Sequence, residues 1–484
     1  MSEELRKYQT DGLNKIFEKW KAGKRSVLFQ MPTGTGKTVL FSEIVRRGFN
    51  KKRKILIVAH RKELVEQIKN KLISKNIEAG IIMAGEKPDY SKIVQIASIQ
   101  TLSRRKHPEA NLIIIDECHH AKADTYKKLW EIYPNTKFLG VTATPIRLNG
   151  DGFDDLFEDL IISMSVQEFI SLGFLVPITH YVCSNPDLSK VKQRQGDYET
   201  KMLADIMMNN SVMSDLVESY QKICDGKTAI IFAVDVEHSK EISIRFNRAG
   251  ISAAHIDAKT PTLERQRILS EFRDKKIKVV SNVEIITEGF DFPECEVVQL
   301  ARPTKSLSLY LQMVGRVMRT AKGKKEGIIL DNASLWLEHG ISTLDRDWDL
   351  KGFDKKSKKT REIQLLAKDE NDFIKKIERN RLGEIKGLKL IPLSLEFERL
   401  LIFEGLLSFS KDKEFKLLKS YNDYKTWLED KNIKLTDVEF EYIQKRLNYL
   451  NHKMPEEKRF NKGFWYHQSK ELGLKKPKWE GTAK

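Results

Sequence analysis

The chain has 484 residues, of which 40% are hydrophobic and 9% aromatic, and its formal net charge is +17. This composition excludes an intrinsically disordered protein, and the length predicts about three domains. No apolar run reaches the roughly 18 residues of a membrane span, and the N-terminal segment Met1–Gly12 has no apolar core of a secretory signal. The positive charge suits a polyanionic partner, of which nucleic acid is the obvious example.

The four cysteines lie far apart in the sequence and form no CxxC pair. This spacing argues against a disulfide framework and against a Cys-based zinc site, and it favours a reducing compartment. The residues are Cys118, Cys183, Cys224 and Cys295.

Short apolar, β-branched runs alternate with longer amphipathic stretches from residue 1 to about residue 345. This alternation predicts parallel sheets covered by helices on both faces, so the expected fold class is α/β with two tandem domains. The expected strands are Ser26–Gln30, Ile55–Ala59, Ile93–Ala97, Leu112–Ile115 and Phe138–Val141, followed by Ala229–Val234, Ala253–Ile256, Val279–Val280, Val297–Leu300 and Gly327–Leu330.

Three domains are expected from these patterns. The first spans residues 1–174 and the second 175–345, of which residues 175–226 form a polar, helix-prone connector without a clear strand pattern. Residues 346–484 contain a charged linker at 351–360 and are expected to form a basic, mainly helical accessory domain. Within that domain, Lys462–His467 places aromatic residues among lysines, which favours a small helical core over a base-stacking surface.

A glycine-containing loop, Met31–Thr38, follows the first expected strand and leads directly into a helical pattern. Gly34 and Gly36 allow backbone N–H groups to surround phosphate oxygens, and the helix N-terminus adds partial positive charge. Lys37 would reach the β- and γ-phosphates of ATP, and the Thr38 hydroxyl would bind Mg²⁺. The first position of the loop is Met31, whereas the strict pattern has Gly, but the strand–loop–helix context supports the match. The predicted cofactor-binding residues in this loop are Thr33, Gly34, Thr35, Gly36, Lys37 and Thr38.

An acidic pair follows the apolar run Leu112–Ile115, in the order Asp116, Glu117, Cys118, His119. A carboxylate at the C-terminal end of a buried strand lies beside the phosphate loop in a parallel sheet. Asp116 is therefore expected to hold Mg²⁺ through its hydration shell, and Glu117 to orient and deprotonate the attacking water. A metal pair of adjacent histidines is not expected, because adjacent side chains point in different directions, and Cys118 is expected to pack rather than react.

Over residues 1 to about 345 the chain resembles the superfamily 2 helicases of the DExH type. Asp116–His119 resembles motif II of that family, and Thr142–Pro145 resembles motif III. Arg6–Gln9 resembles its adenine-reading element, in which Gln9 would make a bidentate contact to the base, although Lys7 stands where relatives often have Pro. The likeness is greatest to RadD-like and phage DNA-repair helicases grouped with the XPB/Ssl2 branch.

This resemblance implies two RecA-like domains, ATP and Mg²⁺ as cofactors, and a cytoplasmic location in a bacterial or phage-infected cell. It also implies Arg6 and Gln9 as cofactor-binding residues and His119 as a catalytic residue. Relatives often carry a Cys-rich zinc module after the motor, but no cysteine follows Cys295, so no zinc module is expected here.

Two segments of the second half resemble further motifs of the family. Thr287–Asp291 resembles motif V, which implies that Gly289 and Asp291 bind the nucleotide, and Gln312–Arg319 resembles motif VI. Arg316 and Arg319, three apart on an expected helix, would reach across a cleft and stabilise the charge on the transferred phosphoryl group. Gln312 would orient water or phosphate beside them. Hydrolysis is then expected only when the two domains close on the nucleotide.

Polar residues that directly follow expected strands are candidates for holding a nucleic-acid backbone, as motifs of the family do at such positions. Hydroxyl and amide groups suit contacts that release at every step, and no base reading is implied. The predicted contacts are His60, Arg61, Gln100 and Thr101 in the first domain and Phe232, Lys259 and Thr287 in the second.

The function predicted from these features is an ATP-dependent DNA helicase or translocase of single-stranded or branched DNA in repair or recombination, and the resemblance implies 3′→5′ polarity. An RNA helicase is an alternative, because backbone contacts discriminate poorly between the two polymers. A nuclease-coupled restriction motor is another, because Pro186-Asp187 and Glu199–Lys201 form a loose PD…ExK pattern. A non-catalytic clamp is disfavoured by the intact ATP motifs. No membrane is expected as a partner, and no protein partner is indicated.

Overall fold

The computed structural model describes residues 5–120, 123–147, 150–183, 186–194, 196–286, 292–340, 342–343, 346, 348–352 and 391–393. The chain divides into two compact units, Met1–Thr360 with Glu384–Ile391 and Arg361–Gly383 with Pro392–Lys484. The expected accessory domain, including Lys462–His467, falls mostly outside the described residues. In the described ranges no helix is both long enough and apolar enough to cross a membrane.

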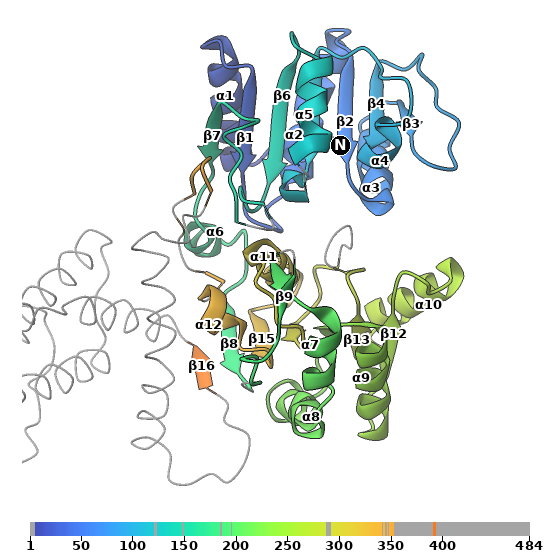
Figure 1. The fold of residues 1–484 in the computed structure, drawn as a ribbon, viewed down its shortest axis with the longest axis vertical. Helices are drawn as coiled ribbons and strands as arrows, with labels where there is room; N and C mark the ends of the chain where they lie inside the picture. Colours follow the sequence, from blue (N-terminus) through green and yellow to red (C-terminus); the bar gives the residue numbers. More distant parts are fainter. Residues whose placement is uncertain are drawn as a thin grey trace, which may run out of the picture. The chain divides into compact units, whose positions relative to one another are not determined.

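Seven parallel strands between residues 26 and 162 form the first sheet, in the order β3-β4-β2-β5-β6-β1-β7 (Figure 1). The central strands are buried along almost their whole length, because a parallel sheet is covered on both faces. The strands are β1 (Ser26–Gln30), β2 (Ile55–Ala59), β3 (Ala79–Ile82), β4 (Val94–Ser98), β5 (Leu112–Asp116), β6 (Lys137–Thr142) and β7 (Asp159–Ile162).

Helices cover the first sheet, and alternate strand residues pack toward opposite faces. Phe29 and Ile57 belong to one core cluster, whereas their neighbours Leu28 and Leu56 belong to another. Helices α1, α2 and α3 contact strands of this sheet. The helices are α1 (Lys7–Lys21), α2 (Lys37–Asn50), α3 (Lys62–Ile73), α4 (Ile99–Leu102), α5 (Ala123–Ile132) and α6 (Val166–Ser171), with a 3₁₀ helix at Cys118–His120.

The second sheet has seven strands, and the six between residues 178 and 331 are parallel and lie in the order β12-β13-β11-β14-β15-β8 (Figure 1). They are β8 (Ile178–Val182), β11 (Ala229–Phe232), β12 (Ala253–Ile256), β13 (Val279–Asn282), β14 (Val297–Leu300) and β15 (Gly327–Asp331). A small antiparallel pair, β9 (Gln193–Arg194) and β10 (Asp197–Tyr198), and a short strand, β16 (Ile391–Leu393), are also described.

The helices around the second sheet begin at side-chain caps in several places; for example, Asp235 accepts the His238 N–H at the start of α9. They are α7 (Thr200–Met207), α8 (Asn210–Cys224), α9 (Val236–Arg248), α10 (Thr262–Arg273), α11 (Leu307–Val314) and α12 (Leu335–His339). We call the part built on the first sheet, residues 5–171, the first lobe, and the part built on the second, residues 178–340, the second lobe. Residues 172–177 are the connecting segment.

The expectation of two parallel-sheet domains is confirmed, and each of the ten expected strands overlaps an observed one. One expectation was wrong. Residues 175–226 were expected to be a helix-prone connector without strands, but Ile178–Val182 forms β8, which pairs with β15 in the second sheet. The partial exposure of four of its five residues explains why it produced no continuous apolar run.

Candidate nucleotide site and nucleic-acid interface

The carboxyl ends of three adjacent strands, β5, β6 and β1, meet at one edge of the first sheet. The register pairs Gln30 with Thr142 and Asp116 with Val141, so the phosphate loop and the acidic pair begin at the same level. A pocket of about 900 Å³ lies at this edge. It is lined by all the described residues predicted to bind the nucleotide: Arg6, Gln9, Thr33, Gly34, Thr35, Gly36, Lys37, Thr38, Asp116, Glu117, Arg316 and Arg319.

The phosphate loop is fixed by contacts from helix α1. Tyr8 donates its hydroxyl hydrogen to Thr35 O at 2.7 Å, and Gln9 Nε2 donates to Gly36 O at 3.3 Å. The φ angle of Gly36 is 91°, a left-handed value that favours glycine. Lys37 is only 8% exposed, and its Nζ lies 3.6 Å from Glu117 Oε1. The Lys37 ammonium group therefore lies beside the Glu117 carboxylate at the pocket.

The acidic pair lies beside a chain of hydrogen bonds inside the first lobe. Glu117 Oε2 lies 3.4 Å from His119 Nδ1, and the same nitrogen lies 3.0 Å from Thr142 Oγ1. Thr142 in turn donates to Thr144 O at 2.9 Å. Asp116 is 4% exposed and accepts the N–H of Glu117. This arrangement places His119, which the resemblance implied to be catalytic, beside the Glu117 carboxylate.

Helix α11 of the second lobe contacts this chain at two points one turn apart. Gln312 Nε2 donates to His119 Nε2, and Thr144 Oγ1 donates to Ser308 Oγ at 2.8 Å. Gln312 was expected to orient water or phosphate, but in the structure its amide bonds to His119. Ser308 was not predicted from the sequence.

The two arginines of the QxxGRxxR segment line the pocket, but they do not lie on a helix. Helix α11 ends at Val314 with Gly315 as its C-cap, so the expectation that Arg316 and Arg319 share a helix face was wrong. A Cβ on Gly315 would lie 2.5 Å from Thr33 Cβ, which shows how closely this turn approaches the phosphate loop. Arg319 pairs with Leu175 in an isolated antiparallel bridge. The two arginines are therefore positioned by the turn after α11 and by the Leu175–Arg319 bridge, and not by a helix.

Cys118 is 1% exposed, and burial raises the pKa of its thiol well above the usual range. A thiol that stays protonated is a poor nucleophile, which agrees with the packing role expected for it. All four cysteines are free and buried.

The loose nuclease pattern has a structural explanation. Glu199 is the N-cap of helix α7 and accepts the N–H groups of Lys201 and Met202, while Asp187 accepts the N–H of Ser189. The backbone hydrogen bonds lower the pKa of Glu199, and a hydrogen bond from the Ser189 side chain, with that from the Ser189 N–H, lowers the pKa of Asp187. Glu199 stands at a helix start rather than on a strand, so the geometry does not favour a nuclease site.

The predicted nucleic-acid contacts of the first lobe follow the neighbouring strands β2 and β4. Gln100 is exposed, and its Nε2 donates to His60 O at 2.9 Å, which ties the two loops together. Thr101 is half-buried in the short helix α4. Arg61 Nη1 donates to the backbone oxygen of Glu284 in the second lobe at 2.7 Å. These residues share a sheet edge with the phosphate loop but lie on the other half of it.

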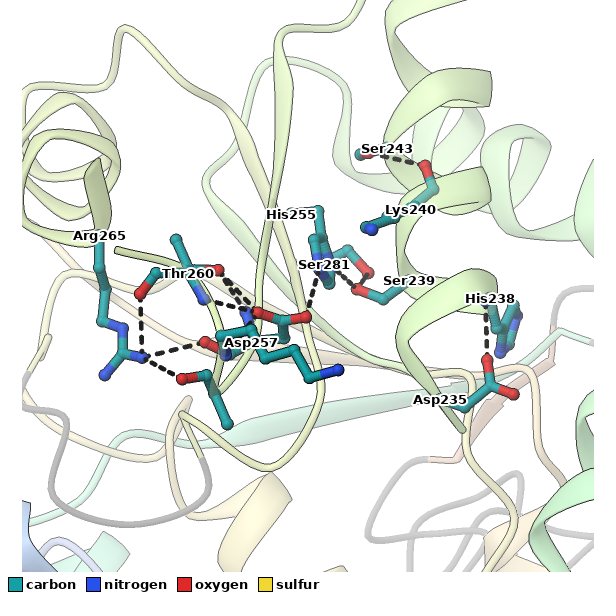
Figure 2. Close-up of polar contacts among 12 residues, drawn as sticks. Asp235, His238, Ser239, Lys240, Ser243, His255, Asp257, Thr260, Arg265 and Ser281 are labelled. Carbon is teal, nitrogen blue, oxygen red and sulfur yellow. Dashed lines mark hydrogen bonds and ion pairs between the residues drawn. The ribbon is translucent and has the colours of Figure 1, made fainter. Parts of the chain in front are cut away.

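In the second lobe the loop after β12 contains Lys259, and Figure 2 shows Asp257 and Thr260 of the same loop. Asp257 Oδ1 accepts the N–H groups of Lys259 and Thr260, and Arg265 Nη2 donates to Asp257 O at 3.0 Å. Burial would raise the pKa of Asp257, but these hydrogen bonds, with that from the Thr260 hydroxyl, lower it overall. Lys259 is exposed at the tip of this braced loop.

The prediction that Phe232 contacts nucleic acid has to be corrected. It is 2% exposed at the end of β11 and belongs to the hydrophobic core, so its side chain does not reach a surface that nucleic acid could touch. Residues at a strand end alternate between faces, and the spacing did not show which way this one points. Three other predicted residues, Thr287, Gly289 and Asp291, lie outside the described residues.

Two family models match the chain. The model for the res subunit of type III restriction enzymes matches residues 2–147, and the model for the conserved C-terminal domain of helicases matches residues 211–321. The first match lies in the first lobe, and the second lies in the second lobe.

Three relatives show how far the likeness extends. A 51.5 kDa protein of Lactococcus phage (isolate 7-9) is 37% identical over 324 residues, which cover 66% of this chain and 68% of the phage protein. A Saccharomyces cerevisiae protein with the name "Putative ATP-dependent helicase IRC3" is 30% identical over 68% of this chain and 51% of its own length. DNA 3′-5′ translocase XPB2 of Sulfurisphaera tokodaii is 24% identical over 68% of this chain and 81% of its own.

Proposed function

We propose, because the chain belongs to the superfamily 2 helicases in the branch of XPB-like and restriction-enzyme motors, that it hydrolyses ATP in order to move along DNA. The observation that carries this proposal is a single pocket lined by Lys37 and Glu117 of the first lobe and by Arg316 and Arg319 of the second. Phosphoryl transfer needs positive charge around the γ-phosphate and a group that orients water, and these side chains supply both.

In the proposed reaction a water oxygen bonds to the γ-phosphorus while the bond from that phosphorus to the bridging oxygen breaks. Glu117 accepts the water proton, and ADP and phosphate leave. Lys37 and the two arginines compensate the negative charge that the transferred group carries. His119 lies beside the Glu117 carboxylate, and Gln312 ties that histidine to the second lobe.

The donor atoms at the pocket also suit Mg²⁺. Thr38 offers a hydroxyl and Asp116 a carboxylate, both in the pocket lining, and oxygen ligands are those that this ion prefers. These two residues would hold the ion, which neutralises charge on the β- and γ-phosphates when it is bound.

We further propose that the loops after β2, β4 and β12 hold the nucleic-acid backbone, through His60, Gln100, Thr101 and Lys259. Contacts between the lobes at His119–Gln312 and Arg61–Glu284 support a coupling between the nucleotide state and these loops. Lobes that change their separation during hydrolysis, while each holds the polymer, would produce net movement along it.

DNA is the proposed polymer. The net charge of +17 supports a nucleic-acid partner, and one relative is named as a DNA translocase. We propose single-stranded or branched DNA as the substrate, 3′→5′ polarity by likeness to the family, and a role in repair or recombination.

The test is the rate of ATP hydrolysis by the full chain without nucleic acid and with equal amounts of single-stranded DNA, forked DNA or RNA, at fixed salt. We expect either DNA to stimulate hydrolysis more than RNA does. Lys37→Ala should abolish the stimulated rate and keep DNA binding, because it removes a phosphate contact and leaves the proposed DNA-binding loops unchanged. Equal stimulation by RNA would contradict the choice of DNA, and a rate that ignores nucleic acid would contradict a motor.

A further inference from the structure

The small antiparallel pair β9–β10 lies between the two segments that the family models match, so neither model covers it. Its register pairs Arg194 with Asp197. Gly196 has a φ angle of 88°, a left-handed value that suits a tight turn between two strands. We call residues 190–194 and 196–198 the basic hairpin.

The basic hairpin is anchored in a small apolar cluster of the second lobe. Val191 is 8% exposed and belongs to this cluster with Leu203 and Met207 of helix α7, and Tyr198 packs against it. The Lys305 ammonium group lies 5.1 Å from the centroid of the Tyr198 ring, which is a cation–π distance. These contacts hold the hairpin in a defined position on the lobe.

The hairpin exposes three cationic side chains, those of Lys190, Lys192 and Arg194. The acidic residues of the same stretch each accept backbone N–H groups: Asp187, Asp197 and Glu199. Because backbone donors occupy these carboxylates, an anion from outside can approach the three cations. Exposed cations of this kind suit the phosphates of a nucleic-acid backbone.

The basic hairpin is bonded to the loop that follows β14. Asp197 Oδ2 accepts the Thr304 hydroxyl at 2.6 Å, and Asp197 Oδ1 accepts the Lys305 N–H at 2.7 Å. The loops after β12, β13 and β14 all follow the carboxyl ends of parallel strands, so they lie at one edge of the second sheet. The hairpin therefore reaches the same sheet edge as the loop that carries Lys259.

A series of contacts at this edge also leads to the first lobe. Arg302, in the loop after β14, pairs with the Glu284 carboxylate at 2.7 Å. The backbone oxygen of Glu284 accepts a hydrogen bond from Arg61 at 2.7 Å. The hairpin thus joins a surface that already contains predicted nucleic-acid contacts from both lobes.

The same bonds connect the hairpin to helix α11. Thr304 Oγ1, which donates to Asp197, also accepts the N–H of Ser306, and Ser306 is the N-cap of α11. This helix carries Ser308 and Gln312, which bond to the hydrogen-bonded side chains of the first lobe. Asp197 therefore fixes the start of the helix that reaches the catalytic residues.

We infer that the basic hairpin binds phosphates of the nucleic-acid backbone and that Asp197 transmits this binding to α11. The inference rests on the proposed function and adds to it a contact surface outside the loops after β2, β4 and β12. Lys190, Lys192 and Arg194 hold the polymer without reading its bases. Asp197 is a positioning residue, because it acts on hydrolysis through the helix and not on the nucleotide.

The first experiment measures the affinity of the full chain for single-stranded DNA over a range of salt concentrations. The variant carries Lys192→Ala and Arg194→Ala together. We expect its affinity at 0.1 M salt to fall about tenfold or more, and the slope of log affinity against log salt to decrease by about 1.4, since each lost phosphate contact contributes about 0.7.

The matched control carries Lys51→Ala and Arg53→Ala, which remove the same two charges. Both residues are exposed and precede β2, so they lie at the sheet edge opposite the phosphate loop. The control should keep the wild-type affinity and slope. A hairpin variant with the wild-type affinity and slope, or an equal loss in the control, would overturn the contact.

The second experiment tests the link to α11 with Asp197→Ala and Asp197→Asn. We expect Asp197→Ala to lower kcat at saturating DNA about tenfold, the effect of losing hydrogen bonds to a charged group, while the half-saturating DNA concentration stays within twofold. Asp197→Asn should recover part of kcat, because its amide oxygen can still accept the Lys305 N–H.

An unchanged kcat in Asp197→Ala would overturn the link, and so would an equal loss of kcat and DNA affinity, which indicates a merely structural role. Failure of the proposed function gives a different result. In that case hydrolysis by the wild type ignores DNA, whereas failure of the hairpin contact leaves DNA-stimulated hydrolysis intact and only the variants lose their expected effects.

Discussion

Glu117 has a backbone conformation that residues other than glycine seldom adopt, with a φ angle of 46°. Its N–H donates to Asp116 Oδ1 at 3.1 Å, which stabilises the turn. The turn directs the carboxylate to within 3.6 Å of Lys37 Nζ and 3.4 Å of His119 Nδ1. Strained backbone of this kind gathers at functional sites, which supports Glu117 as the general base.

We predict that Glu117→Gln lowers kcat for ATP hydrolysis by about a hundredfold or more, because an amide cannot accept the water proton. The variant keeps the size and shape of the side chain, so ATP binding and DNA binding should persist. Steady-state kinetics with a parallel DNA-binding titration make the comparison. Normal turnover in this variant would remove Glu117 from the proposed chemistry.

At the residue scale, the sequence predicted the local parts of the site and missed the long-range ones. The phosphate loop and the acidic pair are continuous segments, so their residues could be named without a structure. Ser308 could not, because it meets Thr144 across 164 positions. Phe174, which lines the pocket, could not be named either, because it packs against Tyr8 of the first helix, far away in the sequence.

Helix α11 joins the second lobe to the hydrogen-bonded side chains beside the acidic pair of the first lobe. Ser308 and Gln312 lie one turn apart and meet Thr144 and His119. All four side chains are buried, so a lost partner leaves an unsatisfied polar group rather than a hydrated one.

We predict that Gln312→Ala lowers kcat about tenfold, since one buried hydrogen bond to the histidine that lies beside Glu117 is lost. Ser308→Ala is the matched control, because it removes the other contact of the same helix face but none to His119. The measurement is the kcat for ATP hydrolysis of both variants at saturating ATP. An equal fall in both would mean that α11 matters only for packing between the lobes.

The strands show the same limit of prediction at the element scale. β2 and β14 have the expected bounds, and every residue of both strands is buried. β3, β7 and β8 were not expected, and each is partly exposed, so the run of apolar residues is broken. A strand that is buried on one face only lacks the continuous apolar sequence that predicts a buried parallel strand.

At the scale of the whole molecule, the second lobe approaches the phosphate loop very closely. A Cβ on Gly34 would lie 3.0 Å from Arg319 Cγ, and Gly315 is equally constrained by Thr33. Glycine at both places lets backbone and side chain meet without a clash. The guanidinium groups therefore belong to the pocket because of the approach of the lobes and not because of a shared helix face.

We predict that Arg319→Ala reduces kcat about a thousandfold or more, the effect typical of an arginine that stabilises the transition state from a second domain. Arg319→Lys should recover only part of the rate, because an ammonium lacks the planar fork. Arg267→Ala, on the exposed side of α10, serves as the control and should hydrolyse ATP at the wild-type rate. A small effect of Arg319→Ala would place the arginine outside the reaction.

The bridge between Leu175 and Arg319 makes the crossing point of the chain a fulcrum. Strand β8 begins just after it, while β12, whose loop carries Lys259, is five strand positions away in the sheet, roughly 24 Å. Rotation about such a pivot moves atoms in proportion to their distance from it. If the lobes rotate about this pivot in the proposed cycle, a slight change of angle beside the triphosphate would give a longer displacement at Lys259, and the width of the second sheet would set the length of that displacement.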